Sequence, residues 1–377
     1  MQTVDFSRYK YVPAILSDPV GEVAYTRLSA ETRAGVLALF ELCWRPRARD
    51  FEDCIGFISR VEGSHPYLLD IDKRRAPAPY EPRDPSDPVA AQQRYCQEKA
   101  AQVSFNSELD RLLRPNDGFY NWREFLSRFP SSIPVLQMTN PAAQWDDILR
   151  QAELLCVGGA SAAFRIRETR VEDLCSLACE ILQRLPNPRQ LLIILDCGQG
   201  RVRLPQRAAF ASNALEMIQS QIGAHRMKAF RAVCMSNSFT LPAHKGMRFK
   251  ENHDWEVWQR VSATIPLAFG DYAASEREEA HSSYRPWDYR ATVTHALPGG
   301  WLISRHANKN DPKGWTDGCQ KIEKDFRFAP LSSWCDRLIS ETAKAAETAS
   351  EEPRFWHASR INGHIERQYS QATRRVR

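Results

Sequence analysis

The sequence predicts an α/β fold built on a (β/α)8, TIM-like barrel. Short apolar segments alternate with helical patterns eight times along the chain, which is typical of a parallel sheet. The segments are nearly continuous runs of apolar residues, so both faces of the sheet must be covered, and eight strands permit closure. No GxGxxG or GxxxxGK[ST] loop follows any segment, which argues against Rossmann and P-loop nucleotide binding.

Each of the eight predicted strands has the length and the Val, Ile, Leu and Phe content of a buried strand. They are Tyr11–Leu16, Val36–Leu42, Tyr67–Asp72, Ile133–Thr139, Ala163–Arg167, Leu191–Cys197, Phe230–Ser236 and Ile265–Tyr272. The helical patterns between them fall at 20–33, 52–62, 89–128 with breaks, 141–155, 171–184, 206–222 and 254–262. Most of these connections are long enough for the crossover that parallel strands require.

Three regions depart from a minimal barrel. Residues 73–118 form a long excursion after the third strand, and such a length suggests a lid or a partner surface. Residues 290–305 read as a β-hairpin that turns at Pro298-Gly299-Gly300. We therefore predict one barrel domain over 9–330 that includes both regions. The third region, 331–377, is predicted to be a C-terminal helical extension with a basic tail.

Composition is that of an ordinary globular protein. The 377 residues include 51 Lys and Arg against 46 Asp and Glu, and 43% are apolar, which excludes disordered, collagenous and coiled-coil classes. The ten cysteines are scattered singly, as reduced, buried thiols are. With no membrane-spanning apolar run and no signal-peptide core, we expect a cytoplasmic protein without a membrane partner.

The positive charge is concentrated at the C-terminal end. Residues 353–377 hold six arginines and one acid, which equals the formal excess of +5 of the whole chain. The segment has no clear amphipathic period, so we expect a solvated, frayed terminus that is dispensable for folding. Such a basic tail could also contact nucleic acid or an acidic partner protein.

Polar and ionisable residues recur where the predicted strands end. In a (β/α)8 barrel the chemistry lies at these carboxyl ends, and burying unpaired ionisable groups is costly. The recurrence therefore predicts a functional site. The residues concerned are Glu41, Asp70, Asp72, Gln137, Thr139, Arg165, Arg167, Asp196, Ser236, Ser238, Asp271 and Tyr272.

Arg165 and Arg167 are the most informative of these residues. They alternate with the apolar Phe164 and Ile166, so we expect both arginines to point into the barrel. Two guanidiniums there require anions, which could be carboxylates such as Asp196 or a ligand with a phosphate or carboxylate group. The alternative is an ion-pair network that only fills the barrel. We favour a ligand site because several acids and both arginines are predicted at the same end.

Four acids are candidates for catalysis. Glu41, Asp70, Asp196 and Asp271 could act as general acid and base, and Asp70, Asp196 and Asp271 could hold Mg²⁺. No strand end carries a histidine, which weighs against two-histidine phosphodiesterases and His-rich zinc barrels.

Several motifs resemble the beta protein family of phages and bacterial genomes. The opening YVPAIL…GEVAYTRLSAETRAGVLALFEL matches at Tyr11, Pro13, Gly21, Glu22 and Glu41, while Ala38 replaces the usual proline. LLDID, FRIR, LLIILDCG, the Ser-Phe of SNSFT, FGDYA and the Trp-x-x-x-Arg of the hairpin follow in the family's order. The resemblance covers residues 9 to 330 approximately.

The resemblance implies a barrel-like α/β fold, often found in mobile elements or antiviral defence neighbourhoods, with no settled activity. Its signature positions fall on Glu41, Asp70, Arg165, Arg167, Asp196, Ser238, Gly270, Asp271, Tyr272, Trp301 and Arg305. From these we assign substrate binding to Arg165, Arg167, Ser238, Tyr272, Trp301 and Arg305.

Two classes of function remain open. The first is a ligand-binding barrel with an anion or phosphate site at its carboxyl end, with or without a hydrolase or phosphodiesterase-type activity on a nucleotide-like substrate. The second is a non-catalytic sensor or scaffold that binds a partner protein or nucleic acid through the 73–118 insertion and the 353–377 tail. We favour the ligand-binding barrel and leave its catalysis open.

Overall fold

The chain folds around an eight-stranded parallel sheet that curls into a nearly closed barrel. The computed structural model describes residues 2–375 except 46–47, 49, 80–87, 200–203, 264, 276–289, 312 and 346–351. The strand order is β4-β3-β2-β1-β9-β7-β6-β5. A bridge between Val135 and Ala163 joins its two edge strands, with a hydrogen bond of 2.8 Å from the Leu136 N–H to the Ala163 carbonyl.

All eight segments predicted from the apolar runs contribute a strand to this sheet. The strands are β1 (Tyr11–Leu16), β2 (Leu39–Leu42), β3 (Tyr67–Ile71), β4 (Ser132–Pro134), β5 (Ala162–Arg167), β6 (Leu191–Gln199), β7 (Arg231–Asn237) and β9 (Ala268–Asp271). β2, β4 and β9 are shorter than predicted because only part of each apolar run pairs with its neighbours.

The barrel interior is apolar at its amino end. Side chains such as Val12, Leu39 and Ile194 fill it, and Phe6 and Tyr9 join the same cluster. The residues before β1 are held by a hydrogen bond of 3.0 Å from the Val4 N–H to the Ser161 hydroxyl. The chain ahead of β1 therefore packs under the barrel and helps to close its amino end.

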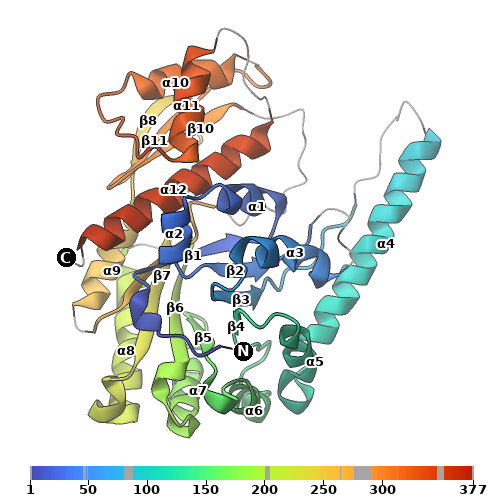
Figure 1. Cartoon of the computed structure of the whole chain (residues 1–377), viewed down its shortest axis with the longest axis vertical. Helices are drawn as coiled ribbons and strands as arrows, with labels where there is room; N and C mark the ends of the chain where they lie inside the picture. Colours follow the sequence, from blue (N-terminus) through green and yellow to red (C-terminus); the bar gives the residue numbers. More distant parts are fainter. Residues whose placement is uncertain are drawn as a thin grey trace.

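Helices cover the outer face of the barrel (Figure 1). Two of them start at an aspartate cap: the Asp18 carboxylate accepts the Gly21 N–H at 2.6 Å, and the Asp50 carboxylate accepts the Asp53 N–H at 2.9 Å. The helices are α1 (Pro19–Thr26), α2 (Ala30–Gly35), α3 (Phe51–Glu62), α4 (Pro88–Leu112), α5 (Asn116–Ser127), α6 (Trp145–Leu155), α7 (Val171–Arg184), α8 (Leu204–Met227) and α9 (Asp254–Ser262).

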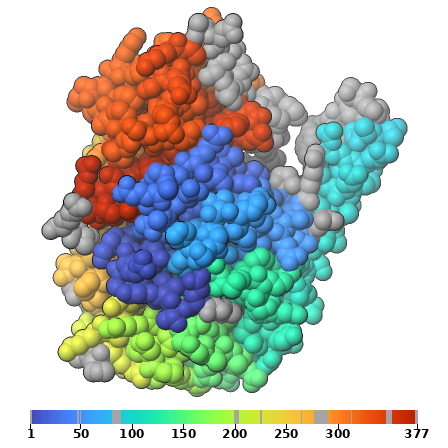
Figure 2. Space-filling model, viewed as in Figure 1, coloured from blue at the N-terminus to red at the C-terminus, as the bar shows by residue number. Residues whose placement is uncertain are grey.

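Helix α4 stands out from the body of the molecule (Figure 2). Its carboxyl half is anchored by buried residues such as Phe105, whose ring stacks on Phe51 with 4.5 Å between centroids. Its amino half is exposed or half-exposed from 89 to 100. The predicted 73–118 excursion thus contains a helical arm, while its residues 80–87 lie outside the described part of the chain.

The chain also forms a second, antiparallel sheet, and one of its strands lies in sequence between the barrel strands β7 and β9. Its order is β10-β11-β8, formed by β8 (Gly246–Glu251), β10 (Thr292–Leu297) and β11 (Gly300–Arg305). Helices α10 (Gly314–Glu323) and α11 (Trp334–Lys344) share a core with it. The sequence predicted the hairpin of β10 and β11 but not β8, because an exposed edge strand carries no apolar run.

The last helix, α12 (Pro353–Arg375), runs between the barrel and the small sheet (Figure 1). Asn362, His364 and Gln368 are buried in it. The Asn362 amide donates to the Ala24 carbonyl at 3.1 Å, and Arg367 Nε donates to the Ala296 carbonyl at 3.0 Å. The expectation of a solvated terminus is therefore wrong. Polar side chains make much of the buried face, so hydropathy gave little signal of burial.

All ten cysteines are free, and Cys96 alone among them is exposed, as predicted for reduced, buried thiols. Among the described residues, no helix combines the length and the apolar character that a membrane crossing requires.

Candidate functional site

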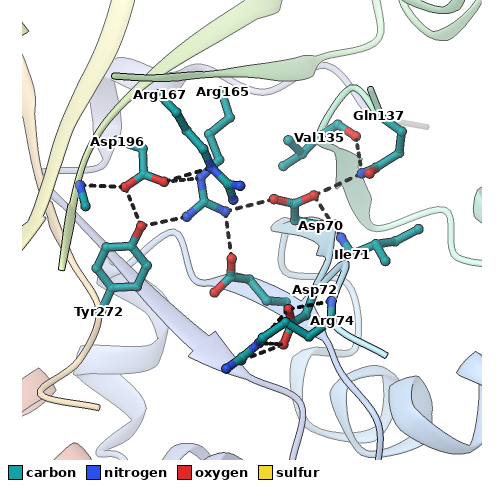
Figure 3. Close-up of polar contacts among 12 residues, drawn as sticks. Asp70, Ile71, Asp72, Arg74, Val135, Gln137, Arg165, Arg167, Asp196 and Tyr272 are labelled. Carbon is teal, nitrogen blue, oxygen red and sulfur yellow. Dashed lines mark hydrogen bonds and ion pairs between the residues drawn. The ribbon is translucent and has the colours of Figure 1, made fainter. Parts of the chain in front are cut away.

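Arg165 is the centre of a buried polar cluster at the barrel mouth, by which we mean the carboxyl ends of the barrel strands (Figure 3). Its neighbours Phe164 and Ile166 pack in the core between the barrel and the surrounding helices. Because side chains alternate along β5, Arg165 points into the barrel, where it is 4% exposed. Nη1 donates to Glu41 Oε1 at 2.6 Å and to Asp70 Oδ2 at 2.9 Å. The guanidinium therefore bridges β5 to β2 and β3.

The other side of the guanidinium contacts Asp196 and Tyr272. Nε donates to Asp196 Oδ2 at 2.9 Å, and Nη2 donates to the Tyr272 hydroxyl oxygen at 2.8 Å. The Tyr272 hydroxyl in turn donates to Asp196 Oδ1, which also accepts the Gly198 N–H at 3.0 Å. Nε, Nη1 and Nη2 of Arg165 are thus all engaged within the protein.

Asp70 is held as a carboxylate. Its Oδ1 accepts the Gln137 amide at 2.9 Å and the Ile71 N–H at 2.8 Å. Burial alone would raise the pKa of Asp70, but the charges of Arg165 and Lys73 outweigh it and keep that pKa below its ordinary value. Asp70 is therefore suited to accept hydrogen bonds and ill suited to act as a general acid near neutral pH.

The cluster fixes the charge of Arg165. Burial opposes the charged form, yet Asp196, Tyr272, Glu41 and Asp70 raise the pKa of Arg165 well above its ordinary value. Three acids surround one buried guanidinium, so Arg165 has the carboxylate partners that were one of two alternatives, and its charge does not require the favoured anionic ligand.

Arg167 occupies the solvent side of the same cluster. Its Nε lies 3.3 Å from Asp196 Oδ2, and its side chain is 49% exposed. The Lys73 side chain lies nearby on the exposed side and donates from Nζ to the Met138 carbonyl. Of the two arginines predicted to face the interior, Arg165 is buried and Arg167 is at the rim.

Asp271 lies apart from the cluster. Because Tyr272 points inward, the preceding Asp271 points to the outer face. There Oδ1 accepts the Tyr11 hydroxyl at 2.8 Å, and Oδ2 lies 2.8 Å from Nε2 of His364. The expectation that the strand-end acids converge therefore holds for Glu41, Asp70 and Asp196 and fails for Asp271.

His364 of α12 is a partner that the sequence analysis missed. Trp301 Nε1 donates to His364 Nδ1 at 3.2 Å, so Nδ1 is an acceptor and Nε2 carries the proton shared with Asp271. The strand ends do lack histidine, but this one comes from a helix 93 residues further along the chain. Neither spacing nor periodicity connects two such positions.

The remaining predicted binding residues lie near the small sheet and not in the Arg165 cluster. The Ser238 hydroxyl donates to Asp254 Oδ2 at 3.1 Å and lies 3.3 Å from Asn252 Oδ1. Trp301 is buried against His364, and Arg305 donates to the Pro242 carbonyl. The six residues assigned to one binding site therefore belong to two places. Arg165, Arg167 and Tyr272 form the first place, and Ser238, Trp301 and Arg305 lie in the second.

The predicted Mg²⁺ ligands do not converge either. Asp70 and Asp196 lie on opposite sides of the Arg165 guanidinium (Figure 3), and Asp271 is on the outer face. Within the described ranges, no three His, Cys, Asp or Glu side chains are grouped so that they could hold a metal ion. The position that a cation would take between these acids is filled by Arg165.

Comparisons with known proteins agree with the resemblance seen in the sequence. The model of the family described as Beta protein matches residues 11–370, which includes most of α12. Protein beta of Enterobacteria phage P4 is 24% identical over 367 residues, which cover 97% of this chain and 94% of the phage protein. No solved structure matches significantly.

Proposed function

The chain belongs to the Beta protein family, and we propose that its barrel mouth binds a small ligand that carries a phosphate or another anionic group. The strand order supports comparison with TIM-like barrels, whose ligands bind at the carboxyl ends of the strands. The match to a phage protein supports a role in a phage or bacterial mobile-element system, of which antiviral defence is one case.

Arg167 is the observation that carries this proposal. Its side chain is half exposed, and its hydrogen bond to Asp196 uses Nε. The two Nη groups are then available in geometry and charge for the oxygens of an anion. Lys73 adds a second positive charge near Asp70, and burial lowers the pKa of its ammonium group to about 8. Arg165 positions these groups through Asp196 and Asp70 and does not itself contact the ligand.

Binding is favoured over hydrolysis. The lowered pKa of Asp70 removes one candidate general acid, and Asp271 faces the outer side of the barrel, where it contacts Tyr11 and His364 instead of the cluster. Glu41 and Asp196 remain candidates for a general base. A nucleotide-like substrate would place its phosphate on Arg167 and Lys73.

The test is a binding series with inorganic phosphate, pyrophosphate and adenosine monophosphate as probes, measured by calorimetry and by thermal shift. We expect at least one probe to bind the native chain, and Arg167→Gln to weaken it by about 10-fold or more. Arg184→Gln is the matched control, since Arg184 is similarly exposed but pairs with Glu153 and Glu180 on the outer helices.

The proposal fails if no probe binds, or if the two arginine variants bind equally well. Release of inorganic phosphate from pyrophosphate, followed with the same preparations, decides separately whether the site is catalytic. Loss of release in Asp196→Asn with retained binding would assign Asp196 a catalytic role.

A scaffold role is the second candidate, and the α4 arm favours it. Val89, Cys96 and Val103 are exposed on this helix and follow one another at intervals of seven residues, about two helical turns. Their face is opposite to the anchored Phe105 face. If the arm binds a partner protein or a second copy of the chain, Val103→Asp should abolish the complex. Val157→Asp, at another exposed valine, should not. Light scattering of the purified chain tests the second copy directly.

A further inference from the structure

Two phenylalanines and an arginine form an exposed surface beside the small sheet. Phe326 follows helix α10 and is 93% exposed, and Phe249 on strand β8 is 39% exposed. The Arg327 guanidinium carbon lies 5.3 Å from the centroid of each ring. We refer to Phe249, Phe326 and Arg327 as the aromatic platform.

The platform is held in place. Arg327 forms a two-pronged ion pair with Asp325, with Nε–Oδ1 and Nη2–Oδ2 distances of 2.8 Å. The Asp325 carboxylate also accepts the Arg327 N–H at 3.0 Å. This pair fixes the guanidinium plane near both rings. It also neutralises the charge of Arg327, so the platform offers flat surfaces rather than a free cation.

Folding does not account for Phe326. A side chain that is 93% exposed removes almost no apolar area from water. A single exposed apolar residue needs no explanation, but here two rings share one fixed guanidinium. Planar groups of this kind are the surfaces on which unpaired bases stack.

The segments that form the small sheet and helix α10, which carry the platform, are basic. Residues 240–252 and 290–328 contain ten Lys and Arg against five Asp and Glu, an excess of five positive charges. Lys250 and Arg305 are bound to neighbouring backbone carbonyls. The exposed members are Lys245, Arg248, Lys309, Lys313, Lys321 and Lys324. This charge complements a phosphate backbone.

We propose that the small sheet and helix α10 bind single-stranded nucleic acid, with bases stacked on Phe326 and Phe249 and phosphates held by exposed lysines of this unit. Stacking on a side chain requires an unpaired base, so the platform selects single strands over duplexes. This site is separate from the barrel mouth, and it uses neither Arg167 nor the basic end of α12.

The experiment measures fluorescence anisotropy with a labelled oligothymidylate of about 20 nucleotides and with a duplex of equal length. We expect the native chain to bind the single strand more tightly than the duplex, and less tightly as salt rises from roughly 50 to 200 mM. Phe326→Ala and Phe249→Ala should each weaken single-strand binding by about 10-fold.

Phe326→Ala keeps the test clear of folding defects because the ring is almost fully exposed. Tyr120→Ala is the matched control, since Tyr120 is an exposed aromatic of α5. The proposal is overturned if the native chain does not bind the single strand, or if Phe326→Ala and Tyr120→Ala bind it equally. Salt-sensitive binding that prefers the duplex would also overturn it, because charge alone would then explain the contact.

Discussion

At the scale of single residues, Arg165 holds the buried acids of the barrel mouth together. It is the buried counter-charge of Glu41, Asp70 and Asp196. Removing one partner of a buried ion pair leaves the others without compensation, which costs far more than removing an exposed pair. Arg165 and Arg167 therefore have different expected roles although both meet Asp196.

We predict that Arg165→Gln lowers the free energy of unfolding by about 3–5 kcal/mol. Arg167→Gln should lower it by about 1 kcal/mol or less, because its side chain is half exposed. Urea unfolding of the two variants measures both values. Equal losses would show that the cluster does not depend on the buried guanidinium.

Glu62 predicts a pH dependence of stability. Burial raises the pKa of Glu62 to about 7 from its ordinary 4.5, against the opposing hydrogen bond from the Tyr25 hydroxyl. Between these values the folded state binds a proton that the unfolded state has lost. The contribution of Glu62 to stability is therefore complete below about pH 4.5 and falls by about 3 kcal/mol as the pH rises to about 7.

Glu62→Gln should remove this fall. Unfolding curves at several pH values between about 4.5 and 7 compare the variant with the native chain, and their difference isolates Glu62 from the other titrating groups. If the two chains show the same slope in this range, the pKa of Glu62 is not raised in the folded state.

Much of the Arg165 cluster could be predicted from the sequence because it depends on strand alternation. An arginine between two apolar residues, and acids at the ends of other strands, are local patterns. These patterns did not reveal that Asp271 points to the outer face whereas Asp196 points into the barrel. Asp271 points outward because the next residue, Tyr272, points inward. His364 could not be found at all, because its contact with Asp271 depends on where α12 packs.

At the scale of elements, helix α12 joins the two parts of the molecule. A Cβ at Gly363 would lie 2.9 Å from both Cβ and Sγ of Cys335 on α11. The glycine therefore permits a close approach of the two helices, and its lack of a side chain is a packing requirement.

Gly363→Ala should lower the free energy of unfolding by about 1–3 kcal/mol through overpacking. Gly56→Ala on α3 is the matched control, because a Cβ there meets only the flexible end of Arg60 at 3.6 Å. This second variant should be neutral or stabilising by up to about 1 kcal/mol. Thermal and urea unfolding of both variants measure these changes. A Gly363→Ala variant that is as stable as the native chain would contradict the prediction.

Strands and helices could be predicted from the sequence where a run or a periodic pattern of apolar residues forms their buried face. All eight barrel strands follow apolar runs, whereas β8 is an exposed edge strand and α12 buries asparagine, histidine, arginine and glutamine. A buried polar face is stabilised by specific hydrogen bonds with distant residues. Such bonds leave no periodic apolar signal in the sequence.

At the scale of the whole molecule, the barrel has a weak seam. β4 and β5 are joined by the Val135–Ala163 bridge, while β6 and β7 pair over six positions. Arg165 reinforces the seam from inside, since it connects β5 to β2 and β3 across the short β4.

We predict that hydrogen exchange is faster for the Leu136 amide at this seam than for the amides of β6. Arg165→Gln should increase the exchange rate at the seam more than at β6, because local opening requires only a few broken contacts there. Exchange followed by mass spectrometry resolves the two regions. Uniform acceleration across the sheet would indicate that the barrel opens as one unit.

The pairing of β1 with β9 has a consequence for folding during synthesis. Tyr11 and Asp271, which share a hydrogen bond, are 260 residues apart. At a ribosomal rate of about 5–20 residues per second, roughly 13–52 s separate their appearance. During that interval the first strand has one of its two neighbours missing and an unpaired edge exposed. A nascent chain of this protein is thus a natural client for chaperones that shield strand edges until the ninth strand emerges.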